Sequence, residues 1–205
     1  MAGRVRVYIA TSLDGFIAGP NDERDWLTDP SPDAALPEGA LGFEAFMLDI
    51  GAMLMGRATY DVVRRIGGPW FYGETPVLVA THRPLDPVVA TVRAVAGDID
   101  ALVDEALRVA GGKDVYLDGG ATIRAALDAG RIDDVVITVI PVVLGAGKSL
   151  FAGASRRCAM ELVSHRDYGG GMVQLHMRPR YGAARTGDTD QAPGAMSLGS
   201  VLGLP

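Results

Sequence analysis

Residues 115–123, with the sequence Val-Tyr-Leu-Asp-Gly-Gly-Ala-Thr-Ile, constrain the fold more than any other stretch of the chain. A continuous apolar run stops at Gly119 and Gly120, and a helical pattern begins directly after them. Such a run is typical of a strand buried on both faces of a parallel sheet. Paired glycines let a ligand approach the backbone, and a helix N-terminus favours an anion. Taken alone, the stretch is better explained as an ordinary turn, because its spacing is not that of a Rossmann fingerprint.

Strands and helices alternate along the rest of the chain. Apolar residues at every second position predict a strand near 4–11, and residues 160–166 and 172–178 flank a glycine-rich turn as an antiparallel hairpin. Further buried strands are expected at 52–55, 77–80 and 135–140, and helices at about 40–49, from Arg57, from Asp98 and after Gly120. This order predicts an α/β fold, a three-layer domain with a mixed, mostly parallel central sheet.

The length of 205 residues fits one domain with a substantial core. We assign this domain to residues 1–182 and expect residues 183–205 to be a flexible tail or to dock on a partner. A net charge of −6 without a long basic cluster argues against a nucleic-acid partner. The longest apolar run is about half a membrane span. Together with a single cysteine, Cys158, these features lead us to expect a cytoplasmic protein that binds no membrane. We predict no metal site.

Glycine, basic and hydroxyl residues follow three of the expected strands, at 56–59, 81–83 and 118–122. The carboxyl ends of parallel strands meet at one edge of a sheet, which is where ligands bind. A dinucleotide would place its phosphates on a helix N-terminus at this edge. We predict that Arg57, Thr59 and Arg83 hold a ribose 2′-phosphate there.

Four motifs in this order resemble the dihydrofolate reductase-like superfamily. They are SLDGFIA at 12–18, MGRATY at 55–60, LDGGAT at 117–122 and PVVLGAGKSLF at 141–151. Within the superfamily the chain is most similar, over about residues 4–180, to the reductase domain of bacterial riboflavin biosynthesis, the RibD C-terminal domain, in its stand-alone form.

The resemblance implies a dihydrofolate reductase-like fold, a homodimer and NADPH as the hydride donor. It implies that the nicotinamide lies near Ala10 and Ile17. The full set of implied cofactor contacts is Ala10, Ile17, Gly56, Arg57, Thr59, Thr81, Gly119, Gly120, Ala121 and Thr122.

The resemblance also indicates substrate-side residues. Asp118 stands where the riboflavin enzymes have a glutamate beside the substrate, and Trp26 matches a tryptophan on their substrate loop. We therefore consider Asp118 and Asp14 candidate catalytic residues, and Trp26 and Asp118 candidates for substrate binding. The structural alternatives are a helix-capping role for Asp118 and a loop-anchoring role for Trp26.

The chain departs from both known substrate signatures. Glu38 and Glu44 are not clearly in register with the pterin-binding carboxylate of dihydrofolate reductases, and Met47 occupies the slot of a phosphate-binding arginine in the riboflavin reductases. Arg24 replaces a serine two residues before the tryptophan.

These features predict an NADPH-dependent oxidoreductase that transfers hydride to a pyrimidine- or pterin-like small molecule, similar to 5-amino-6-(5-phosphoribosylamino)uracil reductase. The alternatives are a dihydrofolate reductase-type activity and a non-catalytic module that senses NADPH. For Arg57 we also consider a purely structural ion pair with Asp61, one helical turn away.

Overall fold

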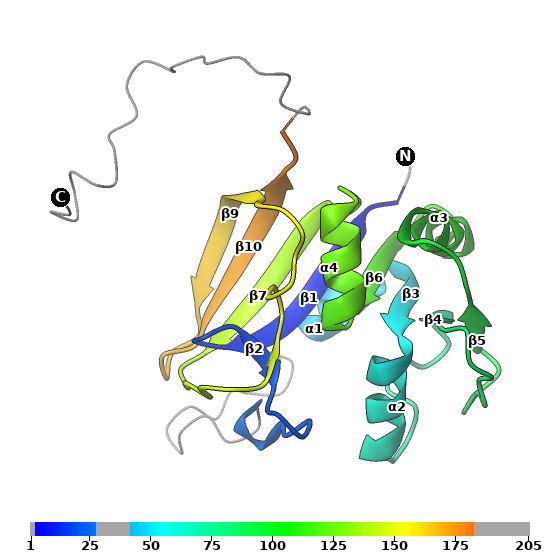
Figure 1. The fold of residues 1–205 in the computed structure, drawn as a ribbon, viewed down its shortest axis with the longest axis horizontal. Coiled ribbons are helices and arrows are strands. Elements are labelled where there is room, and N and C mark those ends of the chain that lie inside the picture. The colour runs from blue at the N-terminus through cyan, green and yellow to red at the C-terminus, as the bar shows by residue number, and fades with distance from the viewer. Residues whose placement is uncertain (1–2, 28–41, 183–205) are drawn as a thin grey trace, which may run out of the picture.

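The computed structural model describes residues 3–27 and 42–182. Its eight-stranded central sheet consists of β1 (Val5–Ser12), β3 (Ile50–Gly56), β4 (Val77–Ala80), β5 (Val92–Val95), β6 (Asp114–Asp118), β7 (Asp134–Ile140), β9 (Ala159–Asp167) and β10 (Val173–Arg180). The strand order is β5-β4-β3-β6-β1-β7-β10-β9 (Figure 1). All pairs from β5 to β7 are parallel, and the β9–β10 hairpin adds two antiparallel strands. The predicted mixed, mostly parallel sheet and the closing hairpin are confirmed.

A smaller sheet pairs β2 (Phe16–Ala18) with β8 (Lys148–Ser149). The helices are α1 (Phe43–Leu48), α2 (Arg57–Ile66), α3 (Ile99–Ala110) and α4 (Gly120–Asp128), with a short 3-10 turn, η1, at Asp25–Leu27. The predicted helices agree with these within the described part of the chain. The tail 183–205, expected to be flexible or to dock on a partner, lies outside the described residues.

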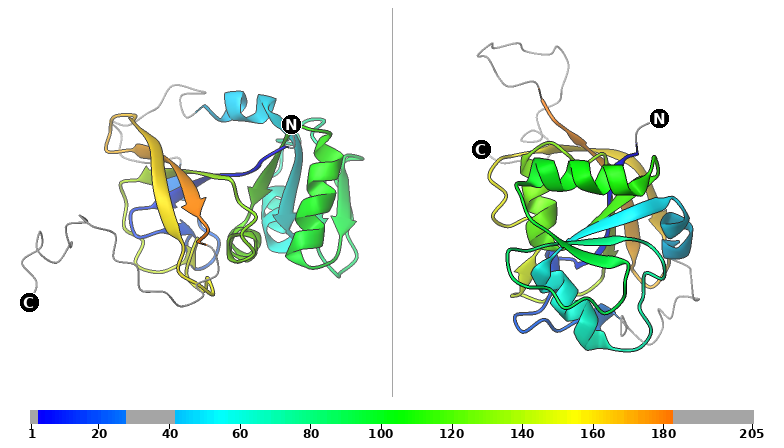
Figure 2. Two further views of the ribbon diagram at one scale, coloured as in Figure 1. Left: turned by 90° about the horizontal axis from the view of Figure 1, so that it is seen from above. Right: turned by 90° about the vertical axis from the view of Figure 1, so that its right-hand side faces the viewer.

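The two faces of the sheet carry separate hydrophobic clusters, because successive side chains of a strand point to opposite faces. Leu54 and Leu117 pack with α3 and α4 on one face. Met53, Met55 and Tyr116 pack on the other face, against residues of α1 and α2. Figure 2 shows α1 and α4 on opposite sides of the sheet. Burial on both faces explains why the central strands have continuous apolar sequences.

Helix α3 begins after Asp98, as the sequence predicts. The Asp98 carboxylate accepts a hydrogen bond from the backbone N–H of Ala101 at 2.8 Å, which caps the first turn. Gly111 ends the helix in the left-handed conformation, with φ 61°. The sequence patterns did not indicate β5 or β8, because β5 is a four-residue edge strand with a polar centre and β8 has only two residues.

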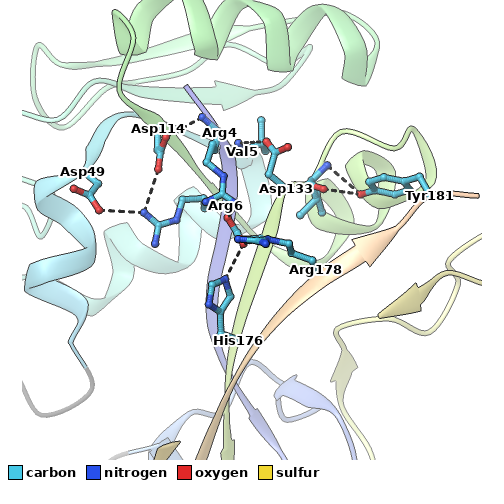
Figure 3. Close-up of polar contacts among 11 residues, drawn as sticks. Arg4, Val5, Arg6, Asp49, Asp114, Asp133, His176, Arg178 and Tyr181 are labelled. Atoms are coloured by element: carbon cyan, nitrogen blue, oxygen red, sulfur yellow. Dashed lines mark hydrogen bonds and ion pairs between the residues drawn. The ribbon is translucent and has the colours of Figure 1, made fainter. Parts of the chain in front are cut away.

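Ion pairs fasten the amino ends of the central strands. Arg6 lies between Asp49 and Asp114, at 3.3 and 3.1 Å (Figure 3). Asp134, which is only 1% exposed, pairs with Arg4, with Arg178 and with His176 Nε2. Burial alone would raise the pKa of Asp134, but the hydrogen bond with His176 and the charge of Arg4 outweigh it and hold this pKa below its ordinary value. This end of the sheet is therefore tightly cross-linked.

The segment after β10 is also fixed. The Tyr181 hydroxyl accepts a hydrogen bond from the Ile132 N–H at 3.1 Å and donates one to the Ile132 carbonyl at 3.0 Å (Figure 3). No helix within residues 3–27 or 42–182 is long and apolar enough to cross a membrane.

Candidate functional site

A cavity of about 820 Å³ lies at the carboxyl ends of the parallel strands β3, β4 and β6. The three strands are neighbours, so the three segments that the sequence analysis singled out do end at one edge of the sheet. The cavity is bordered by the first turns of α2, α3 and α4, by the small β2–β8 sheet and by the loop before η1. Its lining includes these residues from the predicted cofactor set: Ile17, Gly56, Arg57, Thr59, Gly119, Gly120, Ala121 and Thr122.

The two glycine-containing junctions pack directly on each other. Gly119 has φ 91°, and a Cβ at this position would lie 2.2 Å from Thr59 Oγ1. A Cβ on Gly56 would lie 3.1 Å from Thr122 Oγ1. Only glycine therefore fits at position 119, both for its backbone conformation and for its close approach to α2.

Helices α2 and α4 begin at this cavity without a side-chain cap. Their N-cap residues are Gly56 and Gly119, which have no side chain to accept from the first-turn N–H groups. Asp98 caps α3, which also borders the cavity. Two uncapped N-termini at one cavity form a suitable environment for an anionic ligand.

Arg57 lines the cavity, and its guanidinium also forms hydrogen bonds with other groups of the protein. Its Nε donates to Asp61 Oδ1 at 2.8 Å, and its Nη1 donates to the Pro84 carbonyl at 2.7 Å. Arg57 therefore forms the structural ion pair with Asp61 and lines the cavity as well. Arg83 lies outside the cavity lining and reaches Asp61 only at 3.9 Å, with a side chain that is 69% exposed.

Thr81 and Ala10 are not in the cavity lining. The Thr81 hydroxyl oxygen accepts from the Arg83 N–H at 3.0 Å, a local turn contact. Ala10 packs against the hydrophobic cluster that contains Trp26. Their roles as cofactor contacts stay predictions.

Asp118 lies at the carboxyl end of β6, on the same face as Tyr116, directly before Gly119 and outside the cavity lining. Burial raises the pKa of Asp118 from 3.8 to about 6, although the Gly119 N–H and the charge of Arg24 act against this shift. The Gly119 N–H donates to Asp118 Oδ1 at 2.7 Å, so the carboxylate does hold the start of the next helix. Burial also raises the pKa values of Tyr72 and Tyr116, and the neighbouring Asp118 charge adds to both shifts. A carboxyl group in this environment can release or accept a proton near neutral pH.

Trp26 is a packing residue in this structure. It is 8% exposed and packs with Ile140 and Met172, and its Nε1 donates to the Glu23 carbonyl at 3.2 Å. These contacts favour the loop-anchoring alternative. Substrate binding by Trp26 stays a prediction.

Asp14 joins the β1–β2 turn to the loop before β8. Its carboxylate accepts from Ser12 Oγ at 2.6 Å and from the Gly145 N–H at 2.7 Å. The hydrogen bond from Ser12 holds the pKa of Asp14 below its ordinary value. Asp14 is outside the cavity lining, and its catalytic role stays a prediction.

The sequence analysis did not identify a group of charged residues at the cavity. Asp22, which has φ 68°, pairs with Lys148 from β8, with Arg65 from α2 at 3.3 Å and with Arg24 at 3.8 Å. Asp22, Arg24 and Lys148 line the cavity, as does Arg124 from α4. Two members had separate sequence signals: Lys148 lies in the PVVLGAGKSLF motif, and Arg24 replaces a serine before the tryptophan. Within the described ranges, no three His, Cys, Asp or Glu side chains are grouped to hold a metal ion.

Comparison with known proteins identifies the family. Residues 69–174 match the RibD C-terminal domain family. The uncharacterised protein YyaP of Bacillus subtilis (strain 168) is 30% identical over 189 residues, which cover 84% of this chain and 93% of YyaP. The structure of a candidate riboflavin biosynthesis protein from Shewanella sp. PV-4 is 30% identical, with a TM-score of 0.75, over 87% of this chain and 99% of that one.

The fold is shared more widely. Dihydrofolate reductase from Enterococcus faecalis, in complex with NADP(H), superposes with a TM-score of 0.56 at 17% identity, over 88% of this chain and 99% of that one. This likeness shows a dihydrofolate reductase-like fold. The chain belongs to the RibD C-terminal domain family.

Proposed function

We propose that the protein is an NADPH-dependent oxidoreductase that transfers hydride to a pyrimidine- or pterin-like small molecule. The observation that carries this proposal is the cavity at the carboxyl edge of the sheet, where two uncapped helices begin at glycines and basic side chains gather. Its volume of about 820 Å³ is in the range of cofactor sites. Membership of the RibD C-terminal domain family supports a reductase.

The residues present fit a dinucleotide phosphate. The first residues of α4 line the cavity, and no N-cap side chain accepts from their backbone N–H groups, which leaves these groups available to a phosphate. Arg57 and Thr59, at the start of α2, would hold the 2′-phosphate, and Ile17 would support the nicotinamide end. NADPH supplies a hydride from its nicotinamide ring when bound.

Asp118 is the group that we propose as proton donor. A substrate that accepts hydride at a ring carbon also takes up a proton, and a carboxyl group with a pKa of about 6 can supply it near neutral pH. The half-buried ring of Tyr72, whose pKa is raised in part by the nearby Asp118 charge, suits a planar heterocycle.

Cofactor binding is tested by titrating NADPH and NADH against wild type and Arg57→Ala, followed by fluorescence. A charge-assisted hydrogen bond contributes on the order of 1.5–3 kcal/mol, so Arg57→Ala should weaken NADPH binding roughly 10- to 150-fold. NADH lacks the 2′-phosphate, and its affinity should barely change. Equal losses for the two cofactors would contradict the phosphate contact and leave Arg57 with its ion pair to Asp61.

Turnover is tested separately by incubating the protein with NADPH and a panel of pyrimidines and pterins while following NADPH absorbance. Oxidation of NADPH with one class of compound would support the reductase and identify the substrate class. Tight NADPH binding without turnover on any compound would favour the sensor alternative.

We also propose that the protein is a homodimer. Among the described strands, β9 lies at the edge of the central sheet and has β10 as its single partner. It exposes Leu162 and Val163, at 52% and 40%. An edge strand with exposed apolar side chains is suited to pairing with a second copy of the chain.

A further inference from the structure

The basic residues of the cavity differ in how far the protein neutralises them. Arg57 pairs with Asp61, and Lys148 and Arg24 pair with Asp22. Among the described residues, Arg124 contacts neutral groups: its Nη1 donates to the Ser149 carbonyl at 2.9 Å and to the Leu150 carbonyl at 3.2 Å. In the part of the chain that the structure describes, no carboxylate lies within ion-pair distance of Arg124.

Arg124 is also positioned beside the paired glycines. Its Nη1 lies 3.0 Å from the point that a Cβ on Gly120 would occupy. The side chain is half-buried, and its two carbonyl contacts connect α4 to β8 and so fix the guanidinium. An arginine has five N–H donors on three nitrogens, and only Nη1 is engaged here by described residues.

A fixed guanidinium without a counter-ion, next to an uncapped helix N-terminus, favours a phosphate group. We propose that Arg124 binds and neutralises the diphosphate bridge of the dinucleotide, whereas Arg57 holds its 2′-phosphate. The inference rests on the proposed function. It assigns two different phosphate groups of one ligand to two different arginines, on α4 and α2.

A purely structural role is the competing explanation, because Arg124 connects α4 to Ser149 and Leu150. Arg124→Gln separates the two roles. A glutamine keeps an N–H donor for these carbonyl groups but removes the charge. Arg124→Lys keeps the charge and loses the planar fork.

The experiment measures Kd for NADPH and NADH, together with the melting temperature of the ligand-free protein. Both cofactors contain the diphosphate, so Arg124→Gln should weaken both by the same factor, roughly 10- to 100-fold, and leave the preference for NADPH unchanged. The melting temperature should stay near that of wild type, and Arg124→Lys should recover part of the binding. Arg57→Ala should instead reduce the preference for NADPH. Arg108→Gln serves as a control with the same charge change, because Arg108 pairs with Glu105 on α3, outside the cavity.

Three results would overturn the assignment. Unchanged affinity of Arg124→Gln for both cofactors would exclude a phosphate contact, and a loss confined to NADPH would assign Arg124 to the 2′-phosphate. A loss that accompanies a lower melting temperature, without recovery in Arg124→Lys, would leave only the structural role. If wild type binds neither cofactor, the proposed function itself fails, which the wild-type titration shows before any variant is compared.

Discussion

At the scale of single residues, Asp118 couples proton binding to folding. Its pKa rises from 3.8 to about 6 on burial, so the folded protein binds this proton more tightly than the unfolded chain does. The resulting stabilisation is fully present below about pH 4 and is lost as the pH rises through about 6. Above that pH, the folded state carries a negative charge on this partly buried side chain.

We expect Asp118→Asn to be more stable than wild type at pH 7.5, by an amount on the order of 2–3 kcal/mol at about 1.4 kcal/mol per pKa unit. The gain should shrink towards pH 4, where wild type is protonated. Denaturant unfolding at both pH values measures this difference. Asp14→Asn is the matched control with the opposite sign, because the pKa of Asp14 is lowered and its charged form is the stabilising one. A gain for Asp118→Asn that is the same at both pH values would show that this carboxyl titrates normally.

At the scale of elements, the β6–α4 junction explains why a strand, two glycines and a helix follow each other. Gly119 combines a positive φ with a contact to Thr59 that leaves no room for a Cβ. Gly112, at the turn after α3, has a nearly identical φ of 93°, but no atom lies within 4 Å of the point that a Cβ there would occupy. Comparing substitutions at these two glycines therefore distinguishes the cost of a positive φ from the cost of the steric contact with Thr59.

We expect Gly119→Ala to lower the free energy of unfolding by more than Gly112→Ala does. Both substitutions place a Cβ at a positive φ that other residues rarely adopt, at a cost on the order of 1–3 kcal/mol. Only Gly119→Ala also pushes α2 away from α4, and it should therefore also weaken NADPH binding. Thermal unfolding and a cofactor titration measure the two effects. Similar behaviour of the two variants in both assays would show that the Thr59 contact relaxes without cost.

At the scale of the whole molecule, the edge strand β9 determines how copies of the chain can meet. We expect a dimer in light scattering at micromolar concentration, with twice the chain mass of 21.5 kDa. The double variant Leu162→Lys/Val163→Lys should be a monomer, because charges on an edge strand oppose pairing between sheets. Leu48→Lys, at an exposed position on α1, is the control that should remain dimeric. A wild-type mass near 21.5 kDa would contradict the proposed homodimer.

Local patterns accounted for most of the fold. Continuous apolar runs predicted β3, β4 and β6, and the Asp98 cap predicted the start of α3, because these signals depend on neighbouring residues alone. They also located the glycine-containing cavity edge, since parallel strands end on the same side.

Sequence patterns could not predict contacts between residues that lie far apart in the chain. Asp22 and Lys148 are 126 residues apart, and no periodicity connects them. The carbonyl partners of Arg124 are equally hidden from sequence patterns, at Ser149 and Leu150. The buried state of Trp26 also depends on Ile140 and Met172, from β7 and the hairpin turn. The sequence therefore predicted the sheet edge at which the cavity lies, but not which of its basic residues pair with carboxylates.

The ion pairs of Arg6 with Asp49 and Asp114 lie at the amino ends of β3 and β6, whose carboxyl ends border the cavity, and Arg4 pairs with Asp134 on the neighbouring β7. Stability and ligand contact thus depend on opposite ends of the same sheet. In a lineage of such proteins, residues around the cavity can change without loosening the cross-links at Asp114 and Asp134. Such an arrangement allows one ancestral scaffold to acquire new ligand preferences by mutation while the domain continues to fold.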